Sequence, residues 1–203
     1  MFKKIPFYKA TFNDQDPNMG VYAIALVDHP AIEEKWVTFA ENQKLFKLQS
    51  EEKRIISGVL LIPDLPVYRN DKDLGEYYLI FEKDVIYKTA LNYFKNYRQA
   101  NFNQMHNNSL IEKNITVFES QIIDKSRGNE GNKLLGDLPD GAWWVSLKID
   151  NEEIWTDFVK TGIFTGLSIE GIFNYLPENS ELKEIEMFIK GISEILLRKP
   201  DTF

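Results

Sequence analysis

Short runs of apolar residues, each followed by polar or turn-forming residues, recur through most of the chain. Runs of this length, rich in β-branched and aromatic side chains, predict β-strands. The run at 143–149 alternates, so that the odd-numbered residues from Trp143 to Ile149 share one face. The predicted strands cover residues 21–27, 35–39, 45–48, 54–62, 76–81, 115–123 and 143–149, together with the stretch around Ser168.

Apolar residues at helical spacing predict three helices. They are residues 85–97 after the N-cap residue Asp84, a short helix from Asp150 or Asn151 to Thr161, and residues 181–198 after the N-cap residue Ser180. Strands and helices do not alternate regularly, as they would in a parallel βαβ sheet. The pattern therefore predicts an α+β fold with a mainly antiparallel, barrel-like β-sheet and about three packed helices.

Composition narrows the possible functions. The chain has 203 residues, of which 43% are hydrophobic, and this is enough for one domain spanning residues 1–203. A net charge of −7 argues against a nucleic-acid or anionic-membrane partner. No cysteine is present, which excludes disulfides and thiolate nucleophiles. No apolar run reaches the ~20 residues of a membrane-spanning helix and no signal peptide is evident, so we expect an intracellular protein.

A polar segment interrupts the strand pattern at 125–140. It contains three glycines and Pro139 among charged and amide side chains. This composition is typical of a mobile loop. Because the segment lies between two predicted strands, we interpret it as an insertion within one domain.

Candidate chemistry centres on Ser168, in the sequence Gly166-Leu167-Ser168-Ile169-Glu170-Gly171. Its flanking glycines would let a substrate backbone approach the hydroxyl closely. A serine hydroxyl needs a neighbouring base to become nucleophilic, and histidine is suited to that role. The chain has two histidines, His29 and His106. His106 lies in a polar stretch that resembles the end of a strand before a turn, whereas His29 precedes Pro30 and reads as a turn residue.

A third group would have to orient the imidazole. Strict alternation in the strand 115–123 places Glu119 on one face with Ile115, Val117, Gln121 and Ile123. A carboxylate among apolar side chains needs a partner, which an imidazole would supply. Asp124 is the alternative. The residues alone leave open whether Ser168 is structural or nucleophilic. Two histidines without metal-ligand spacing argue against a metal hydrolase, and no cofactor motif is present.

The ordered set of motifs resembles the phage prohead (capsid maturation) serine protease family, which is distantly similar to herpesvirus assemblin. The matching segments are residues 27–32, 61–63, 67–69, 75–78, 105–106, 118–120, 122–124, 141–144, 148–155 and 166–171. The resemblance implies a herpesvirus-protease-like fold, with Ser168 as nucleophile and His106 as general base. The phage branches of the family use an acidic third member, for which we select Glu119.

The resemblance also implies partners. Proteases of this family are packaged inside the assembling procapsid in the host cytoplasm, where they process scaffold protein and the major capsid protein. Self-cleavage is common among them, and the segment 125–140 would be a suitable site. Herpesvirus assemblins are dimers, so we expect a homodimer. The alternative is a non-enzymatic scaffold or capsid-associated protein that keeps the fold without the activity.

Overall fold

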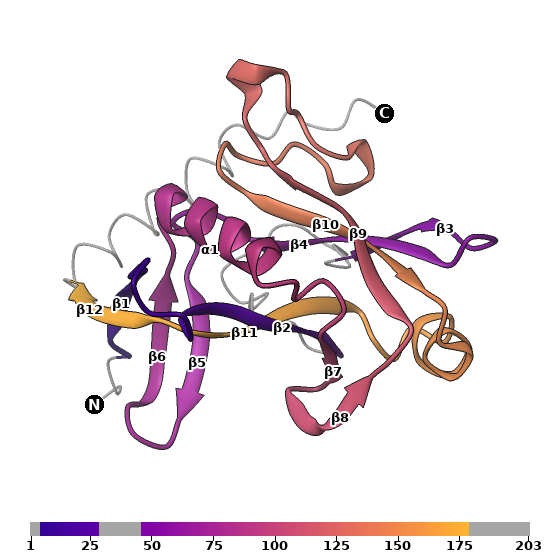
Figure 1. Cartoon of the computed structure of the whole chain (residues 1–203), viewed down its shortest axis with the longest axis horizontal. Coiled ribbons are helices and arrows are strands. Elements are labelled where there is room, and N and C mark those ends of the chain that lie inside the picture. Colours follow the sequence, from indigo (N-terminus) through magenta and orange to yellow (C-terminus); the bar gives the residue numbers. More distant parts are fainter. Residues whose placement is uncertain (1–4, 29–45, 179–203) are drawn as a thin grey trace, which may run out of the picture.

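Three four-stranded sheets make up most of the molecule in a computed structural model, which describes residues 5–28 and 46–178 (Figure 1). Sheet A has the order β12 (Asn174–Glu178), β1 (Phe7–Thr11), β6 (Gly75–Ile80), β5 (Val67–Asp71). Sheet B has the order β11 (Gly166–Ile172), β2 (Gly20–Val27), β7 (Phe102–Gln104), β8 (Asn107–Glu112). Sheet C has the order β3 (Phe46–Ser50), β4 (Ile55–Leu61), β10 (Trp143–Ile149), β9 (Ile115–Ile122).

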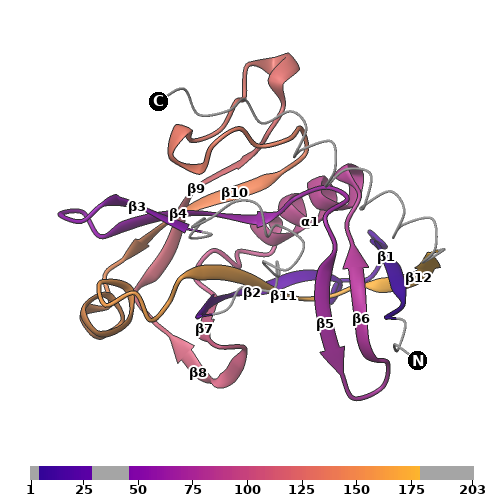
Figure 2. The same cartoon turned by 180° about the vertical axis from the view of Figure 1, so that it is seen from behind.

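The predicted predominance of antiparallel strand pairs is confirmed, but the described residues form a mainly β structure rather than an α+β fold, and the expected barrel is wrong. Most neighbouring strands are antiparallel, whereas β1 pairs with β6 and β2 with β7 in parallel. No closed barrel forms among residues 5–28 and 46–178, because the strands divide among three separate sheets. Only Phe173 separates β11 of sheet B from β12 of sheet A, so one extended segment links these two sheets (Figure 2).

The described part of the chain contains two helices. α1 (Lys83–Lys95) corresponds to the helix predicted at 85–97, and it buries Ile86, Ala90 and Tyr93. Asp84 is not its N-cap residue; it lies in the first turn and pairs with Lys88 at 2.7 Å. The second predicted helix is a short segment of π type, Ile154–Val159. The third, at 181–198, lies outside the described residues, as does the strand predicted at 35–39.

Side chains from all three sheets and from α1 share the main hydrophobic core. In sheet B this core takes alternate residues of β11, Leu167 and Ile169. In sheet C it takes Val145 and Leu147 of β10, as the alternation at 143–149 predicted. The residues between them, such as Ser168, therefore project from the opposite faces of the sheets.

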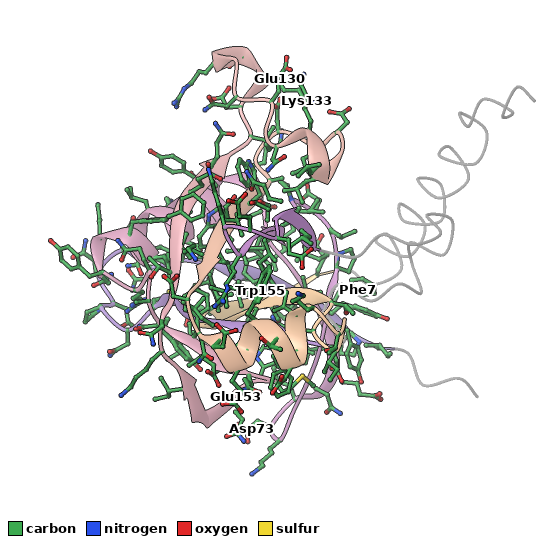
Figure 3. The ribbon with its side chains drawn as sticks, turned by 90° about the vertical axis from the view of Figure 1, so that its right-hand side faces the viewer. Phe7, Asp73, Glu130, Lys133, Glu153 and Trp155 are labelled. Carbon is green, nitrogen blue, oxygen red and sulfur yellow. The ribbon has the colours of Figure 1, made fainter. Side chains whose placement is uncertain are left out.

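The polar segment 125–140 connects β9 to β10. It forms two short 3₁₀ turns, Lys125–Arg127 and Lys133–Leu135. Leu138 anchors it by packing with Trp144 in a second, smaller apolar cluster. Glu130 and Lys133 of this segment lie at one end of the molecule, and Asp73 and Glu153 lie toward the opposite end (Figure 3). No helix of the described residues is long and apolar enough to cross a membrane.

Candidate active site

Ser168 lies in the middle of β11, on the face turned away from the main core. Its register partner on β2 is Ala25, whose own partner on β7 is Asn103, so the three residues form one row across sheet B. Ser168 is only 4% exposed, and its Oγ makes no hydrogen bond with any described residue. A buried hydroxyl without a partner is costly for stability, and such groups are found at catalytic sites.

Glu170 shares the face of Ser168, two residues further along β11. It is 8% exposed, and its Oε1 accepts a hydrogen bond from Nδ2 of Asn103, which is 2% exposed. This bond crosses β2, which lies between the two strands. The crossing is possible because the residues of β2 beneath it, Ala23 and Ala25, carry only methyl groups. Small side chains on the central strand thus let polar groups from its two neighbours meet.

His106 reaches the same carboxylate from the hairpin between β7 and β8. Met105 and His106 form the two-residue turn, with φ values of 50° and 58°. Positive φ at both positions is typical of a type I′ turn, in which Asn and Gly are preferred. For other residues this conformation costs on the order of 1–2 kcal/mol each. Strain of this kind is concentrated at functional sites, and here it aims the imidazole at Glu170.

The His106 imidazole and the Glu170 carboxylate form a pair at the edge of the buried row. His106 Nδ1 lies 3.2 Å from Glu170 Oε1, and the His106 side chain is 41% exposed. A carboxylate can only accept a hydrogen bond, so Nδ1 carries the hydrogen. Nε2 is then the nitrogen that is able to accept a proton. Ser168, Glu170, Asn103 and His106 therefore place a hydroxyl, a carboxylate, an amide and an imidazole together.

Electrostatics keep the imidazole neutral near neutral pH. Burial lowers the pKa of His106 below its ordinary value of 6.5. Glu170 opposes this by its charge and its hydrogen bond, whereas the positive charge of Arg69 lowers the pKa further. A neutral imidazole is the form that serves as a base.

Titration of His106 by NMR tests these opposing effects. His29→Gln leaves His106 as the one imidazole of the chain. In that background we expect a midpoint below 6.5. Glu170→Gln should move it lower, because the stabilising anion is lost, and Arg69→Gln should move it higher, because a repelling cation is lost. A midpoint above 6.5, or a downward shift in Arg69→Gln, would contradict the description.

A cleft of about 520 Å³ opens beside the pair. His106 and Glu170 line one side of it, and Arg69 of β5 lines another. Aromatic side chains supply much of the remaining wall: Tyr22, Tyr77, Phe81, Phe173 and Tyr175. The candidate base therefore lines a cavity large enough for part of a substrate, whereas Ser168 is not among the residues of its wall.

The structure does not bring Glu119 to His106. Glu119 lies on β9 in sheet C, opposite Ser146 of β10. The register of this pair shifts between Ser146 and Leu147, whose partner is Val117, so Phe118 forms a bulge. The bulge turns Glu119 to the face away from the main core, so the predicted shared face is wrong for Ile115 and Val117 but holds for Gln121. Glu119 Oε2 is buried there without a described partner.

Neither the alternative third member, Asp124, nor the second histidine, His29, is among the described residues of this site. Asp124 accepts hydrogen bonds from Ser126 and from the backbone of Arg127, and so caps the turn after β9. The Ser126 hydrogen bond lowers the pKa of the Asp124 carboxyl. His29 lies outside the described residues. No group of three or more His, Cys, Asp or Glu residues able to hold a metal ion occurs in the described ranges.

Two polar residues of this site, Glu170 and Asn103, were not predicted from the sequence. Glu170 had a usable signal, since a residue two positions after Ser168 in a strand shares its face. Asn103 had none, because its place depends on the parallel pairing of β2 with β7. The catalytic roles of Ser168, His106 and Glu119 stay predictions.

A serine hydroxyl and a carboxylate on one sheet face, with an imidazole bound to that carboxylate, are the kinds of groups used by serine hydrolases. The comparison with protein families agrees with this class. Residues 42–176 match the model of a family described as "Putative phage serine protease XkdF". The match covers more than half of the 203 residues, and the chain belongs to this phage serine protease family. Searches of curated proteins and of solved structures gave no match.

Proposed function

We propose that the protein is a serine endopeptidase with Ser168 as nucleophile and His106 as general base. One observation carries the proposal: the unpartnered Ser168 hydroxyl shares the face of β11 with the carboxylate that holds His106. We assign the third position to Glu170 in place of Glu119, because Glu170 makes the hydrogen bond to the imidazole. Asn103 is a positioning residue that holds Glu170.

In the proposed reaction, His106 Nε2 takes the proton of Ser168 Oγ as that oxygen attacks the scissile carbonyl carbon. Glu170 accepts the Nδ1 hydrogen bond and stabilises the imidazolium that results. The imidazolium then protonates the leaving amine, and a water molecule hydrolyses the acyl-enzyme by the same route. Ser168 and His106 are not hydrogen-bonded in the unliganded arrangement. The proposed reaction requires His106 Nε2 and Ser168 Oγ to come within hydrogen-bond distance when substrate binds, as catalytic hydrogen bonds often tighten at that step.

The resemblance to prohead proteases supports a proposal on the substrates. They would be phage scaffold protein and the N-terminal part of the major capsid protein, cleaved inside the procapsid in the host cytoplasm. The segment 125–140 would be the site of self-cleavage, and the active form would be a homodimer.

A second candidate is a scaffold or capsid-associated protein without activity. The low exposure of Ser168 and its lack of a bond to His106 favour this alternative. It keeps the same fold and the same family membership, so only a measurement of reactivity separates it from the protease.

Labelling with a fluorophosphonate separates the two. The probe reacts with serines activated by a neighbouring base, so the protease reading predicts one adduct, mapped to Ser168 by mass spectrometry. His106→Ala should abolish it. Ser146→Ala is the matched control, because Ser146 is also a buried strand serine but hydrogen-bonds Ser57 at 2.8 Å, and labelling should persist. An unlabelled wild-type protein would favour the inactive alternative.

A further inference from the structure

Arg69 has an unusual position for a charged residue. On β5 it pairs with Tyr77 of β6, and its neighbour two residues earlier, Val67, pairs with Leu79. Val67, Tyr77 and Leu79 all belong to the main core, so Arg69 projects from the core-facing side of sheet A. It is half-buried, and burial lowers its pKa from the ordinary value. Arginine nevertheless keeps its charge in proteins.

This cation lacks a counterion within the described ranges. Its one hydrogen bond there runs from Nη1 to the backbone oxygen of Tyr68, at 3.3 Å. A guanidinium has five N–H donors, and a half-buried charge without an ion pair is unfavourable. Glu170 is the acidic residue whose charge acts on Arg69, but its described bonds go to Asn103 and His106. The donors of Arg69 therefore face the cleft with most of their capacity unused.

We infer that Arg69 binds a carboxylate side chain of the substrate, so that the proposed protease selects Asp or Glu close to the scissile bond. The inference rests on the proposed function and deepens it by naming the substrate class. A guanidinium binds a carboxylate through two parallel hydrogen bonds, and the aromatic walls of the cleft would exclude water from that pair.

The positions of Arg69 and Ser168 also indicate how far the acidic residue of the substrate lies from the scissile bond. Arg69, His106 and Glu170 line one cleft, and Ser168 is two residues from Glu170 on β11. Two residues of a strand span roughly 6.6 Å, so the cleft begins within a few residues of the reacting carbonyl. A basic side chain in this cleft would meet Arg69 with like charge. A neutral side chain would leave the guanidinium buried and unpaired.

The net negative charge of the chain excludes a nonspecific cause for any preference for acidic substrates. At −7 the protein as a whole does not attract acidic peptides. Any preference for Asp or Glu must therefore come from a local contact, and it should disappear when that contact is removed.

Cleavage of a proteome-derived peptide library measures the preference, with Ser168→Ala as the blank. For wild type we expect enrichment of Asp and Glu at one position within about three residues of the cut. Arg69→Gln should reduce the ratio of Glu-containing to Gln-containing products by about tenfold or more. Arg69→Glu should enrich Lys and Arg at that position. Arg54→Gln, which removes an arginine that pairs with Glu152 outside the cleft, is the matched control and should cleave as wild type does.

A binding measurement keeps the inference separate from the proposed function. The His106 ring signals in His29→Gln report on the cleft without any cleavage. N-acetylglutamic acid amide should shift them at lower concentration than N-acetylglutamine amide, and Arg69→Gln should remove the difference. Arg69→Lys, which keeps the charge but not the paired donors, should retain part of it.

The outcomes are distinguishable. A wild type that cleaves without an acidic preference, or whose preference survives in Arg69→Gln, overturns the role of Arg69 and leaves the protease intact. A wild type that cleaves no more than Ser168→Ala overturns the proposed function. In that case equal binding of the two amide probes overturns the carboxylate site as well, whereas Arg69-dependent binding of the acid supports it.

Discussion

Ser168→Ala is expected to abolish peptide-bond cleavage without weakening the fold. Loss of a nucleophile that acts with a base lowers kcat by about 10⁴-fold or more. The free energy of unfolding should stay the same or rise by about 1 kcal/mol, because the substitution removes a buried hydroxyl that has no described partner. The measurements are cleavage of a peptide library and urea unfolding of the same preparations.

Ser146→Ala supplies the comparison. Ser146 is fully buried in β10, and its hydroxyl bonds both Ser57 and Gln49. Its removal should lower the free energy of unfolding by about 1 kcal/mol and leave cleavage unchanged. If Ser168→Ala loses stability as Ser146→Ala does and keeps its cleavage rate, Ser168 is an ordinary structural serine.

Glu170→Gln is expected to lower kcat by about 10²- to 10⁴-fold. The amide keeps the shape of the side chain but no longer stabilises the imidazolium and does not fix the Nδ1–H tautomer. Because Glu170 raises the pKa of His106, its loss should also move the acid limb of the kcat/KM profile to lower pH. The profile of the residual activity across pH 4–8 is the measurement.

Glu119→Gln separates the two assignments of the third member. If Glu170 orients His106, Glu119→Gln leaves both kcat and the acid limb as in wild type. If Glu119 does so, the large loss occurs in Glu119→Gln and Glu170→Gln is nearly neutral. Both residues are carboxylates on strands, so the substitutions are chemically matched.

Local patterns predicted much of the secondary structure. The strands around 21–27, 54–62 and 143–149 and the helix α1 follow from runs of apolar residues with period 2 or 3.6. The strands β1, β5, β8 and β12 were missed because each is short and contains polar residues, whereas β7 agrees with the strand end predicted before the turn at His106. The separation into three sheets depends on pairings between distant residues, such as β1 with β12, which no local pattern reveals.

The sequence likewise predicted only part of the candidate site. Ser168 and His106 were selected because the first has glycines nearby and the second is one of two histidines. The face of Glu119 relative to Ile115 and Val117 was predicted wrongly for a specific reason: alternation was assumed through a strand that contains a bulge at Phe118. A one-residue bulge reverses every face assignment beyond it. A turn at His106 was predicted, but its positive φ values at Met105 and His106 were not, since neither residue type favours them.

Strand β2 lends no reactive group to the site, yet it decides whether the groups on either side of it can meet. Ala23 and Ala25 leave only the height of a methyl group between Asn103 and Glu170. A branched side chain at either alanine would block the contact between Asn103 and Glu170 across β2. The serine, the imidazole and the carboxylate would all still be present in the sequence. A homologue with this change would keep every proposed catalytic residue, and we still expect it to lack proteolytic activity.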